Sequence, residues 1–342
     1  MLKILVTGAA GLIGGELCAR LTANGHQVTA LVHRKPEVRA NDGEAVAVAR
    51  VLHGDVTQRG LGLPTEHLPA DLDLVIHCAA SLHFDAPEEE LQRINVGGTK
   101  HALEFAAAAG AAFLHVSTAY VCGTRDGQIR EEAVQPGTRF ANNYEASKAA
   151  AETAVRTSGV PFAIARPAIV LGHSTTGMIR NFDAIYGAFR MIAKGIVATM
   201  PVGAGATLDF VPIDHVAAGL VALAENMHVA NDGTFHLTSG APVPVSEFAR
   251  AIGSYDQFEM PHLVPAADFD PAALPPRERR AYSRIADAYS TYFQRNPHFD
   301  DRQFRAVTGL ACPETGYDYL IRLIDYCIQQ GFLPAEAYRM SG

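Results

Sequence analysis

A glycine-rich loop near the N-terminus limits the possible folds of this chain more than any other feature. The loop, TGAAGLIG at Thr7–Gly14, follows the apolar run Leu2–Val6 and precedes a helical pattern that extends to about Ala23. Glycines permit a tight turn and a close approach to a pyrophosphate, and a helix N-terminus offers free N–H groups. A spaced glycine triplet alone is a weak indicator, but this strand–turn–helix context predicts a dinucleotide site. The expected contacts are Gly8, Ala10, Gly11, Leu12 and Ile13.

Short apolar runs alternate with helix-like segments through the following part of the chain. Such alternation predicts a parallel sheet with right-handed crossovers, and near-continuous apolar strands suit a sheet covered on both faces. The expected fold class is α/β, a Rossmann-type doubly wound parallel sheet with a smaller, mostly helical C-terminal substrate region. The expected strands are Leu2–Val6, Gln27–Val32, Val46–Leu52, Leu72–His77, Phe113–Ser117 and Phe162–Arg166, with helices at Glu88–Ala109 and Asn142–Ser158.

The alternation changes after Pro167, and this change predicts a division of the chain. We expect a dinucleotide-binding domain at 1–172, to which 205–240 returns through Phe210–Leu223 and Thr234–Thr238. The expected substrate-binding region comprises 173–204, with a helix at about Phe182–Lys194, and the helical and irregular 241–342.

The composition argues against several classes of protein. The formal net charge of −8 disfavours a broad nucleic-acid surface. No run approaches the ~20 apolar residues of a membrane helix, and the apolar start is too short for a signal peptide. The five cysteines are scattered without metal-ligand spacing, so we expect free thiols, no metal site and a reducing, cytoplasmic compartment.

The end of the second expected strand favours NADP(H) as the cofactor. An NAD enzyme usually places a carboxylate there, which binds the ribose hydroxyls of the adenosine. This chain has Arg34 and Lys35, and Arg34 is the better placed to grip a 2′-phosphate. The alternative is a solvated loop whose charges are accidental. Further expected cofactor contacts are Asp55 and Val56 beside the adenine, and Ala79 and Ala80 beside the phosphates.

Tyr144 and Lys148 make the chain an enzyme candidate. They lie four residues apart in YEASK, and positions i and i+4 of a helix share a face. The Lys148 ammonium can favour ionisation of the Tyr144 phenol and reach the sugar of a bound nucleotide, which predicts a proton donor or acceptor near neutral pH. For an isolated YxxxK, an exposed pair on an ordinary helix would be the better interpretation.

Seven motifs in this order resemble the extended short-chain dehydrogenase/reductase superfamily over roughly residues 1–240. Within it, several stretches resemble the thioester-reductase and fatty-acyl-CoA-reductase (male-sterility-like) branch. The motifs are TGxxGxxG (Thr7–Gly14), GDV (Gly54–Val56), HCAA (His77–Ala80), NVxGT (Asn95–Thr99), ST (Ser117, Thr118), YxxxK (Tyr144–Lys148) and RP (Arg166, Pro167). The branch-like stretches are Ala79–Asp85, Val116–Val121, Arg166–Gly172, Val211–Ala217 and, more loosely, Phe299–Asp301.

This resemblance implies catalytic roles. Tyr144 would donate a proton to the substrate oxygen, Lys148 would hold the ribose and lower the pKa of Tyr144, and Thr118 would hydrogen-bond the same oxygen. Asn95 would anchor a water in a proton relay, or else it bonds local backbone. Ser117 is expected to be structural. Ser81, Pro167 and Lys148 complete the implied cofactor contacts.

Other residues are weaker candidates. His83 and Phe84 follow a strand end and are substrate-pocket candidates, and Arg166 either touches substrate or supports the site. Cys122 lacks an obvious histidine partner and is expected to be inert. Asp214 is expected to cap a helix. Arg277, Arg279, Arg280 and Arg284 would dock an acidic carrier protein or the phosphates of coenzyme A, or else form a solvated helix face.

The function predicted from this resemblance is NADPH-dependent reduction of an acyl thioester, bound to coenzyme A or a carrier protein, to an aldehyde or alcohol. A ketone or hydroxyl of a sugar, steroid or polyketide is the first alternative substrate. The others are a thioester hydrolase without redox change and an NADP-binding regulatory protein on the same fold. The expected partners are the substrate, a possible acyl carrier protein and a possible second copy in a homodimer, with no nucleic acid and no membrane span.

Overall fold

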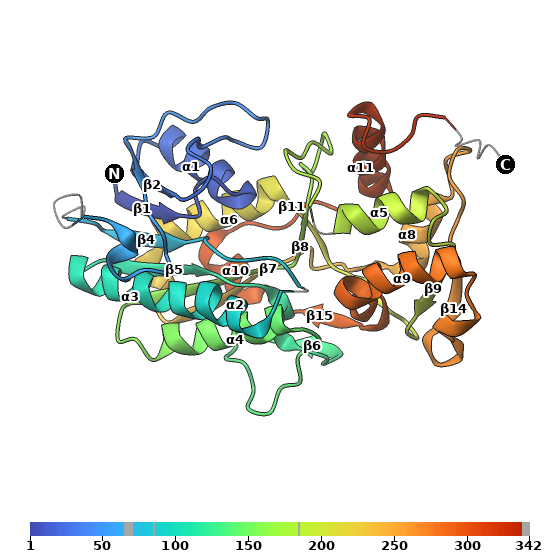
Figure 1. Ribbon diagram of the computed structural model, residues 1–342. Coiled ribbons are helices and arrows are strands. Elements are labelled where there is room, and N and C mark those ends of the chain that lie inside the picture. The colour runs from blue at the N-terminus through green and yellow to red at the C-terminus, as the bar shows by residue number, and fades with distance from the viewer. Residues whose placement is uncertain (65–70, 85, 184, 337–342) are drawn as a thin grey trace.

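The predicted strands assemble into one parallel sheet of seven strands (Figure 1), which confirms the expected fold class. The structure is a computed structural model that describes residues 1–64, 71–84, 86–183 and 185–336, and the side chains of 284–289 are not described. The strand order is β12-β7-β5-β4-β1-β2-β3. These strands are β1 (Lys3–Thr7), β2 (Gln27–Val32), β3 (Arg50–His53), β4 (Leu74–His77), β5 (Ala112–Val116), β7 (Phe162–Pro167) and β12 (Gly233–Leu237).

Helices cover both faces of this sheet, and the alternation of side chains along each strand supplies both interfaces. In β1, Ile4 and Val6 belong to one buried cluster with Leu17 and Leu220, whereas Leu5 belongs to another. One face carries α1 (Leu12–Ala23), α6 (Ile213–Glu225) and α10 (Arg302–Thr308). The other carries α2 (Glu88–Leu91), the π-helical η3 (Gln92–Gly97), α3 (Gly98–Ala109) and α4 (Asn143–Arg156).

Three expected elements differ from the structure. The helix predicted at 88–109 is continuous but contains the π-helical turn η3. The predicted strand at 46–52 is shorter, because Val46 turns back to bond Val38 before β3 begins at Arg50. The segment 210–223 does not add to the main sheet. Its first residues, β11 (Phe210–Pro212), pair with β8 (Ile169–Leu171), and the 3.6-residue apolar period that follows forms α6 instead.

The remaining elements gather beyond the C-terminal ends of the sheet strands, on the right of Figure 1. The helix expected at 182–194 is α5 (Ile185–Ala193). With it lie β9 (Thr199–Val202), β10 (Thr207–Leu208), β13 (Val243–Pro244), α8 (Val245–Ile252), β14 (His262–Pro265), α9 (Pro276–Tyr289) and α11 (Tyr317–Gln329). The smaller elements are β6 (Gly127–Ile129), α7 (Met227–Ala230), β15 (Pro297–Phe299) and the short helices η1 (Arg59–Gly62), η4 (Ala119–Cys122), η5 (Ala266–Asp268), η6 (Pro271–Ala273) and η7 (Ser290–Gln294).

Long-range polar contacts join distant segments of the chain. The Tyr319 hydroxyl donates to the Gly172 carbonyl at 2.6 Å. The buried carboxylate of Glu131 accepts N–H groups from His236, Gln303 and Phe304, so it connects β12 to the start of α10. In the part of the chain that the structure describes, no helix has both the length and the apolarity needed to cross a membrane.

Two glycine-to-alanine substitutions should differ in their effect on stability, because one glycine lies where α6 packs against α10 and the other lies on the exposed face of α5. A Cβ at Gly219 would lie 2.8 Å from the Phe304 ring, whereas a Cβ at the exposed Gly187 of α5 would meet no atom within 4 Å. Because overpacking outweighs helix propensity only at the first position, we expect Gly219→Ala to destabilise the fold by about 1–3 kcal/mol. Gly187→Ala should be neutral or stabilising by up to about 1 kcal/mol. Urea unfolding of both variants measures the difference, and equal shifts would contradict this packing.

Candidate active site

The glycine loop has the close backbone contacts that its sequence predicts. Gly8 has φ of +67°, and a Cβ there would lie 2.7 Å from the Ala79 nitrogen. A Cβ at Gly14 would collide with the Gly8 carbonyl oxygen. Side chains are therefore excluded where the loop meets the end of β4. Gly11 precedes α1 without a side-chain cap, so the first N–H groups of that helix remain available to an anion.

The positions expected around an adenosine lie together at the ends of β1, β2 and β3. The Ala9 N–H donates to the Leu31 carbonyl at 3.3 Å, which sets the loop beside the end of β2. Arg34, three residues later, is exposed, as is Lys35. Burial alone would raise the pKa of Asp55, but hydrogen bonds from the backbone and hydroxyl of Thr57 hold it below its usual value.

The other expected cofactor residues follow β3 and β4 or end β7. The Val56 carbonyl accepts a hydrogen bond from Nδ1 of His101 at 3.0 Å, and Ala79 donates its N–H to the Thr7 hydroxyl. Ala80 and the buried Ser81 follow β4 directly. Pro167 ends β7. The backbone cradle and the open helix N-terminus fit a dinucleotide, and the individual contacts remain predictions.

Arg180 was missed by the sequence interpretation. It comes from the segment assigned to substrate, yet its guanidinium donates to the Gly11 carbonyl at 2.7 Å and the Ala10 carbonyl at 3.3 Å. The same group also bonds the Arg39 carbonyl. These contacts span more than a hundred residues of sequence, so no local pattern could have indicated them. Arg180 therefore adds a positive charge beside the glycine loop.

Lys148 lies on the buried face of α4 and points to the end of β5. Its amine donates to the Val116 carbonyl at 2.8 Å and lies 3.5 Å from Nε2 of His115. Burial lowers the pKa of Lys148 to about 8, while Glu152 and Cys78 favour the charged form. Burial also lowers the pKa of His115, so this imidazole is neutral beside the amine.

Tyr144 lies one helical turn before Lys148 and is also buried. Its ring packs edge-on against Phe84, with ring centroids 5.0 Å apart. Burial raises the pKa of Tyr144, and Glu145 raises it further. The expectation that Lys148 lowers this pKa is wrong in this structure, because the amine turns to Val116. Tyr144 is therefore protonated at neutral pH, which is the form that a proton donor needs.

Thr118 lies at the same strand end, two residues after Val116. Its hydroxyl oxygen accepts a hydrogen bond from the Tyr120 N–H at 3.3 Å and so caps η4, which packs against α4. Ser117 donates its N–H to the Ala165 carbonyl between β5 and β7. Thr118 thus follows the end of β5 directly, and the Lys148 amine reaches the same strand end from α4.

Asn95 connects the two sides of this region. Its carboxamide oxygen accepts the Ser81 N–H at 2.8 Å, and its nitrogen donates to the Ser81 carbonyl and to the Ser147 hydroxyl at 2.9 Å. All of these bonds are buried. They favour the alternative in which Asn95 bonds nearby backbone and side chains, and they tie α4 to the turn after β4.

Two buried ion pairs hold α4 in place. Arg295 donates to Glu145 at 2.9 Å and to the Gly123 carbonyl at 2.8 Å, and its guanidinium lies 4.7 Å from the ring centre of Tyr292. Arg166 holds Glu152 through two hydrogen bonds of 2.8 and 2.6 Å. Arg166 is only 2% exposed, so the structure supports its interpretation as a residue that supports the site.

The structure distinguishes among the weaker candidates by their burial and their contacts. Phe84 lies beside Tyr144, whereas the His83 side chain is exposed. Burial raises the pKa of Cys122 to about 12, which agrees with an inert thiol. The prediction that Asp214 caps α6 is wrong. Its carboxylate accepts hydrogen bonds from the backbone and hydroxyl of Ser174 instead, because it lies within the first turn and faces that loop.

Asp85 and the Arg284 side chain, which the sequence analysis also singled out, lie outside the described residues. Arg277, Arg279 and Arg280 are exposed at the start of α9. Among the residues that the structure describes, no three His, Cys, Asp or Glu side chains gather closely enough to hold a metal ion.

The Arg295–Glu145 pair predicts a strong energetic coupling. Arg295→Met leaves the Glu145 carboxylate buried without its cation, so we expect a loss of about 3–5 kcal/mol in the free energy of unfolding. Adding Glu145→Gln should recover part of that loss, because the uncompensated charge is removed. Urea unfolding of both single variants and the double variant measures the coupling. Simple additivity of the two single losses would contradict a direct pair.

Comparisons with known proteins agree with this geometry. Residues 6–220 match the family model described as male sterility protein. The chain is 30% identical over 282 residues to fatty acyl-CoA reductase 1 of Gallus gallus, covering 65% of this chain and 54% of the relative. It is 27% identical over 323 residues to sterol demethylase protein B of Methylococcus capsulatus, covering 89% and 88%. Other relatives are longer, and the chain spans as little as 4% of their length.

Among solved structures, the terminal R domain of the myxalamid PKS-NRPS biosynthetic pathway is similar, with a TM-score of 0.83 and 26% identity. The superposition covers 98% of this chain and 92% of that domain. These matches, the parallel sheet and the intact YxxxK motif together place the chain in the extended short-chain dehydrogenase/reductase superfamily. The chain belongs to the male sterility protein family within that superfamily.

Proposed function

We propose that this protein is an NADPH-dependent reductase of acyl thioesters. One observation carries the proposal: the Lys148 amine reaches the end of β5 beside Thr118, Tyr144 lies one helical turn before Lys148, and this strand end is two strands from the glycine loop that follows β1. In doubly wound sheets, ligands bind outside the carboxyl ends of the strands, where the order reverses. The similarity to a fatty acyl-CoA reductase and to an R domain of a carrier-linked pathway supports thioesters as the substrate class.

The residues of the chain divide the chemistry among them. A bound reduced nicotinamide would supply hydride to the thioester carbonyl. Thr118 and the protonated Tyr144 would donate hydrogen bonds to the oxygen as negative charge develops there. The oxyanion then re-forms the carbonyl as the carbon–sulfur bond breaks, so an aldehyde remains and the sulfur leaves as a thiolate, which takes a proton from water. Lys148, buried and positioned by the Val116 carbonyl, would hold the ribose of the nucleotide.

In this proposal, different segments of the chain bind the dinucleotide and the acyl group. We assign the dinucleotide to residues 1–172 and 205–240, and the acyl group to 173–204 and 241–342. Arg180 modifies that assignment, because this residue of the substrate segment reaches the glycine loop. A carrier protein is the proposed partner, with coenzyme A as the alternative source of the thioester.

The bacterial sterol demethylase relative favours a second candidate function. It matches 89% of this chain and 88% of its own length, and it is named for a sterol. Reduction of a steroid ketone would use the same three side chains without loss of a thiol. Turnover of ketosteroids but not of thioesters would favour this reaction. Release of free acid without oxidation of NADPH would indicate a hydrolase instead.

Removal of the Tyr144 hydroxyl should abolish most of the reductase activity. With an acyl-coenzyme A or acyl-pantetheine substrate, NADPH oxidation should match aldehyde formation. We expect Tyr144→Phe to lower kcat about 10²–10⁴-fold, because the proton donor is lost while the ring that packs on Phe84 remains.

The matched control is Tyr317→Phe in α11, where the ring stacks on Arg250 away from β5. It should retain activity. An unchanged rate for Tyr144→Phe would contradict the catalytic assignment. Absence of NADPH oxidation with every thioester tested would contradict the proposed function itself.

Arg34 should decide the choice between NADPH and NADH. If its guanidinium binds the 2′-phosphate, Arg34→Ser should weaken NADPH binding about 10–100-fold and leave NADH binding nearly unchanged. Fluorescence titration of both nucleotides measures this selectivity. The control is Arg250→Ser in α8, whose exposed arginine lies outside the nucleotide region. A parallel loss of both nucleotides in the Arg34 variant would contradict a 2′-phosphate contact.

A further inference from the structure

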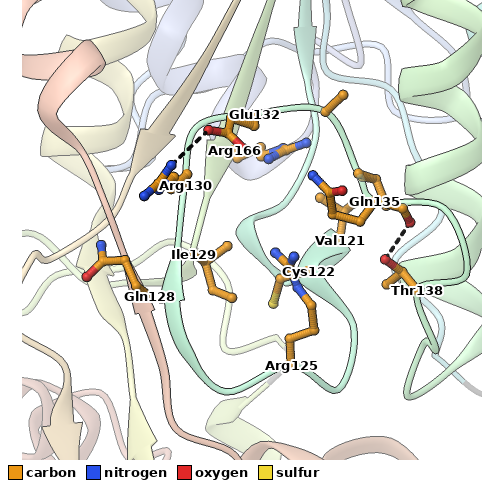
Figure 2. Close-up of a pocket in the computed structure, with 12 residues that line it drawn as sticks. Val121, Cys122, Arg125, Gln128, Ile129, Arg130, Glu132, Gln135, Thr138 and Arg166 are labelled. Atoms are coloured by element: carbon orange, nitrogen blue, oxygen red, sulfur yellow. Dashed lines mark hydrogen bonds and ion pairs between the residues drawn. The ribbon is translucent and has the colours of Figure 1, made fainter.

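A cavity of about 230 Å³ lies beside η4, which follows the C-terminal end of β5, and is lined by three arginines (Figure 2). Arg125 and Arg130 come from the loop around β6, and Arg166 comes from the end of β7. Val121 and Cys122 of η4 form another part of the wall. No step of the proposed reaction uses this cavity.

The charges of this arginine pocket are only partly balanced. Arg166 is held by Glu152, and Arg130 lies 3.7 Å from Glu132, the one carboxylate in the lining. Arg125 has no carboxylate within ion-pair distance among the described residues. Figure 2 shows its side chain pointing from the loop toward Cys122. The pocket therefore presents a guanidinium that is free to bind an anion.

The size of the pocket limits the anion. Pockets for whole small molecules typically measure about 300–1,000 Å³, so this one suits a single polar group rather than a nucleotide. Guanidinium groups match the geometry of phosphate oxygens, which they bind through paired N–H groups. A phosphate ester is therefore the group that best fits both the size and the charge.

The position of the pocket suggests where that phosphate comes from. Val121 lies three residues after Thr118, so their Cα atoms are at most about 11 Å apart. Thioesters of coenzyme A and of carrier proteins share a pantetheine arm that has a phosphate at the end far from the sulfur. A site for that phosphate near, but outside, the reacting centre would hold the arm while its sulfur reaches Thr118.

We propose that the arginine pocket binds the phosphate of a 4′-phosphopantetheine group. This inference rests on the proposed function, since it specifies how a thioester substrate is held. Arg125 is its main ligand, and Arg130 and Arg166 contribute to the positive field. The acyl chain and the reacting carbonyl are not bound by this pocket.

Calorimetric titration of the full chain with three probes tests the proposal without any turnover. The probes are 4′-phosphopantetheine, pantetheine and inorganic phosphate. The wild-type protein should bind 4′-phosphopantetheine at least about tenfold more tightly than pantetheine, and Arg125→Gln should remove that preference. Arg139→Gln is the matched control, because Arg139 is an exposed arginine of the same loop that does not line the pocket. It should keep the preference.

The outcomes separate this proposal from the proposed function. Equal binding of pantetheine and 4′-phosphopantetheine, or an unchanged preference in Arg125→Gln, would overturn the phosphate site. Binding of inorganic phosphate without 4′-phosphopantetheine would also overturn it, because the anion would then be unrelated to the substrate arm. Reduction of acyl-pantetheine should continue at an unchanged kcat in the control variant Arg139→Gln. If the phosphate preference holds while no thioester is reduced, the reductase proposal fails and the binding site remains.

Discussion

The buried charged face of α4 fixes the geometry on which the candidate active site depends. Glu145, Lys148 and Glu152 are each no more than 2% exposed. A buried charge costs several kcal/mol unless a partner or hydrogen bond compensates it. The partners are supplied by three different parts of the chain: the segment before β15, the end of β5 and the end of β7. The helix can therefore dock in only one register, and that register fixes Tyr144.

The sheet topology brings this helix near the nucleotide loop. Parallel strands end at one edge, so the loop after β1, the turn after β4 and the turn after β5 lie side by side. Asn95 connects two of these parts, since it bonds Ser81 after β4 and Ser147 on α4. The neutral imidazoles of His77 and His115 stack between the strands, with centroids 5.7 Å apart. This edge of the sheet thus combines the backbone cradle of the glycine loop with two buried imidazoles, one of which lies beside the Lys148 amine.

The sequence predicted the parts that depend on local pattern. The glycine loop, the strand–helix alternation and the YxxxK helix each follow from neighbouring residues, and the fold class is confirmed by the sheet. The π-helical turn at Gln92–Gly97 left no periodic signal strong enough to separate it from an α-helix. The sequence analysis treated β11 and the following α6 as one segment of the sheet, because both are apolar.

The contacts that the sequence could not indicate are those between distant residues. Arg180 at the glycine loop and Arg295 at Glu145 join positions more than a hundred residues apart. Asp214 bonds Ser174 rather than its own helix. The pKa of Tyr144 was predicted in the wrong direction because its burial was unknown. Each of these errors concerns solvation or a distant partner, which the identity of a residue does not reveal.

The central claim is that hydride reaches a thioester carbonyl held by Tyr144 and Thr118, and isotope transfer tests it most directly. The protein would be given an acyl thioester and NADPH carrying deuterium at both C4 positions. Mass spectrometry of the trapped product should find a single deuterium on the aldehyde carbon, with an equal amount of released thiol. Release of an unlabelled carboxylic acid would contradict the account. So would the absence of both a reduced product and NADPH oxidation.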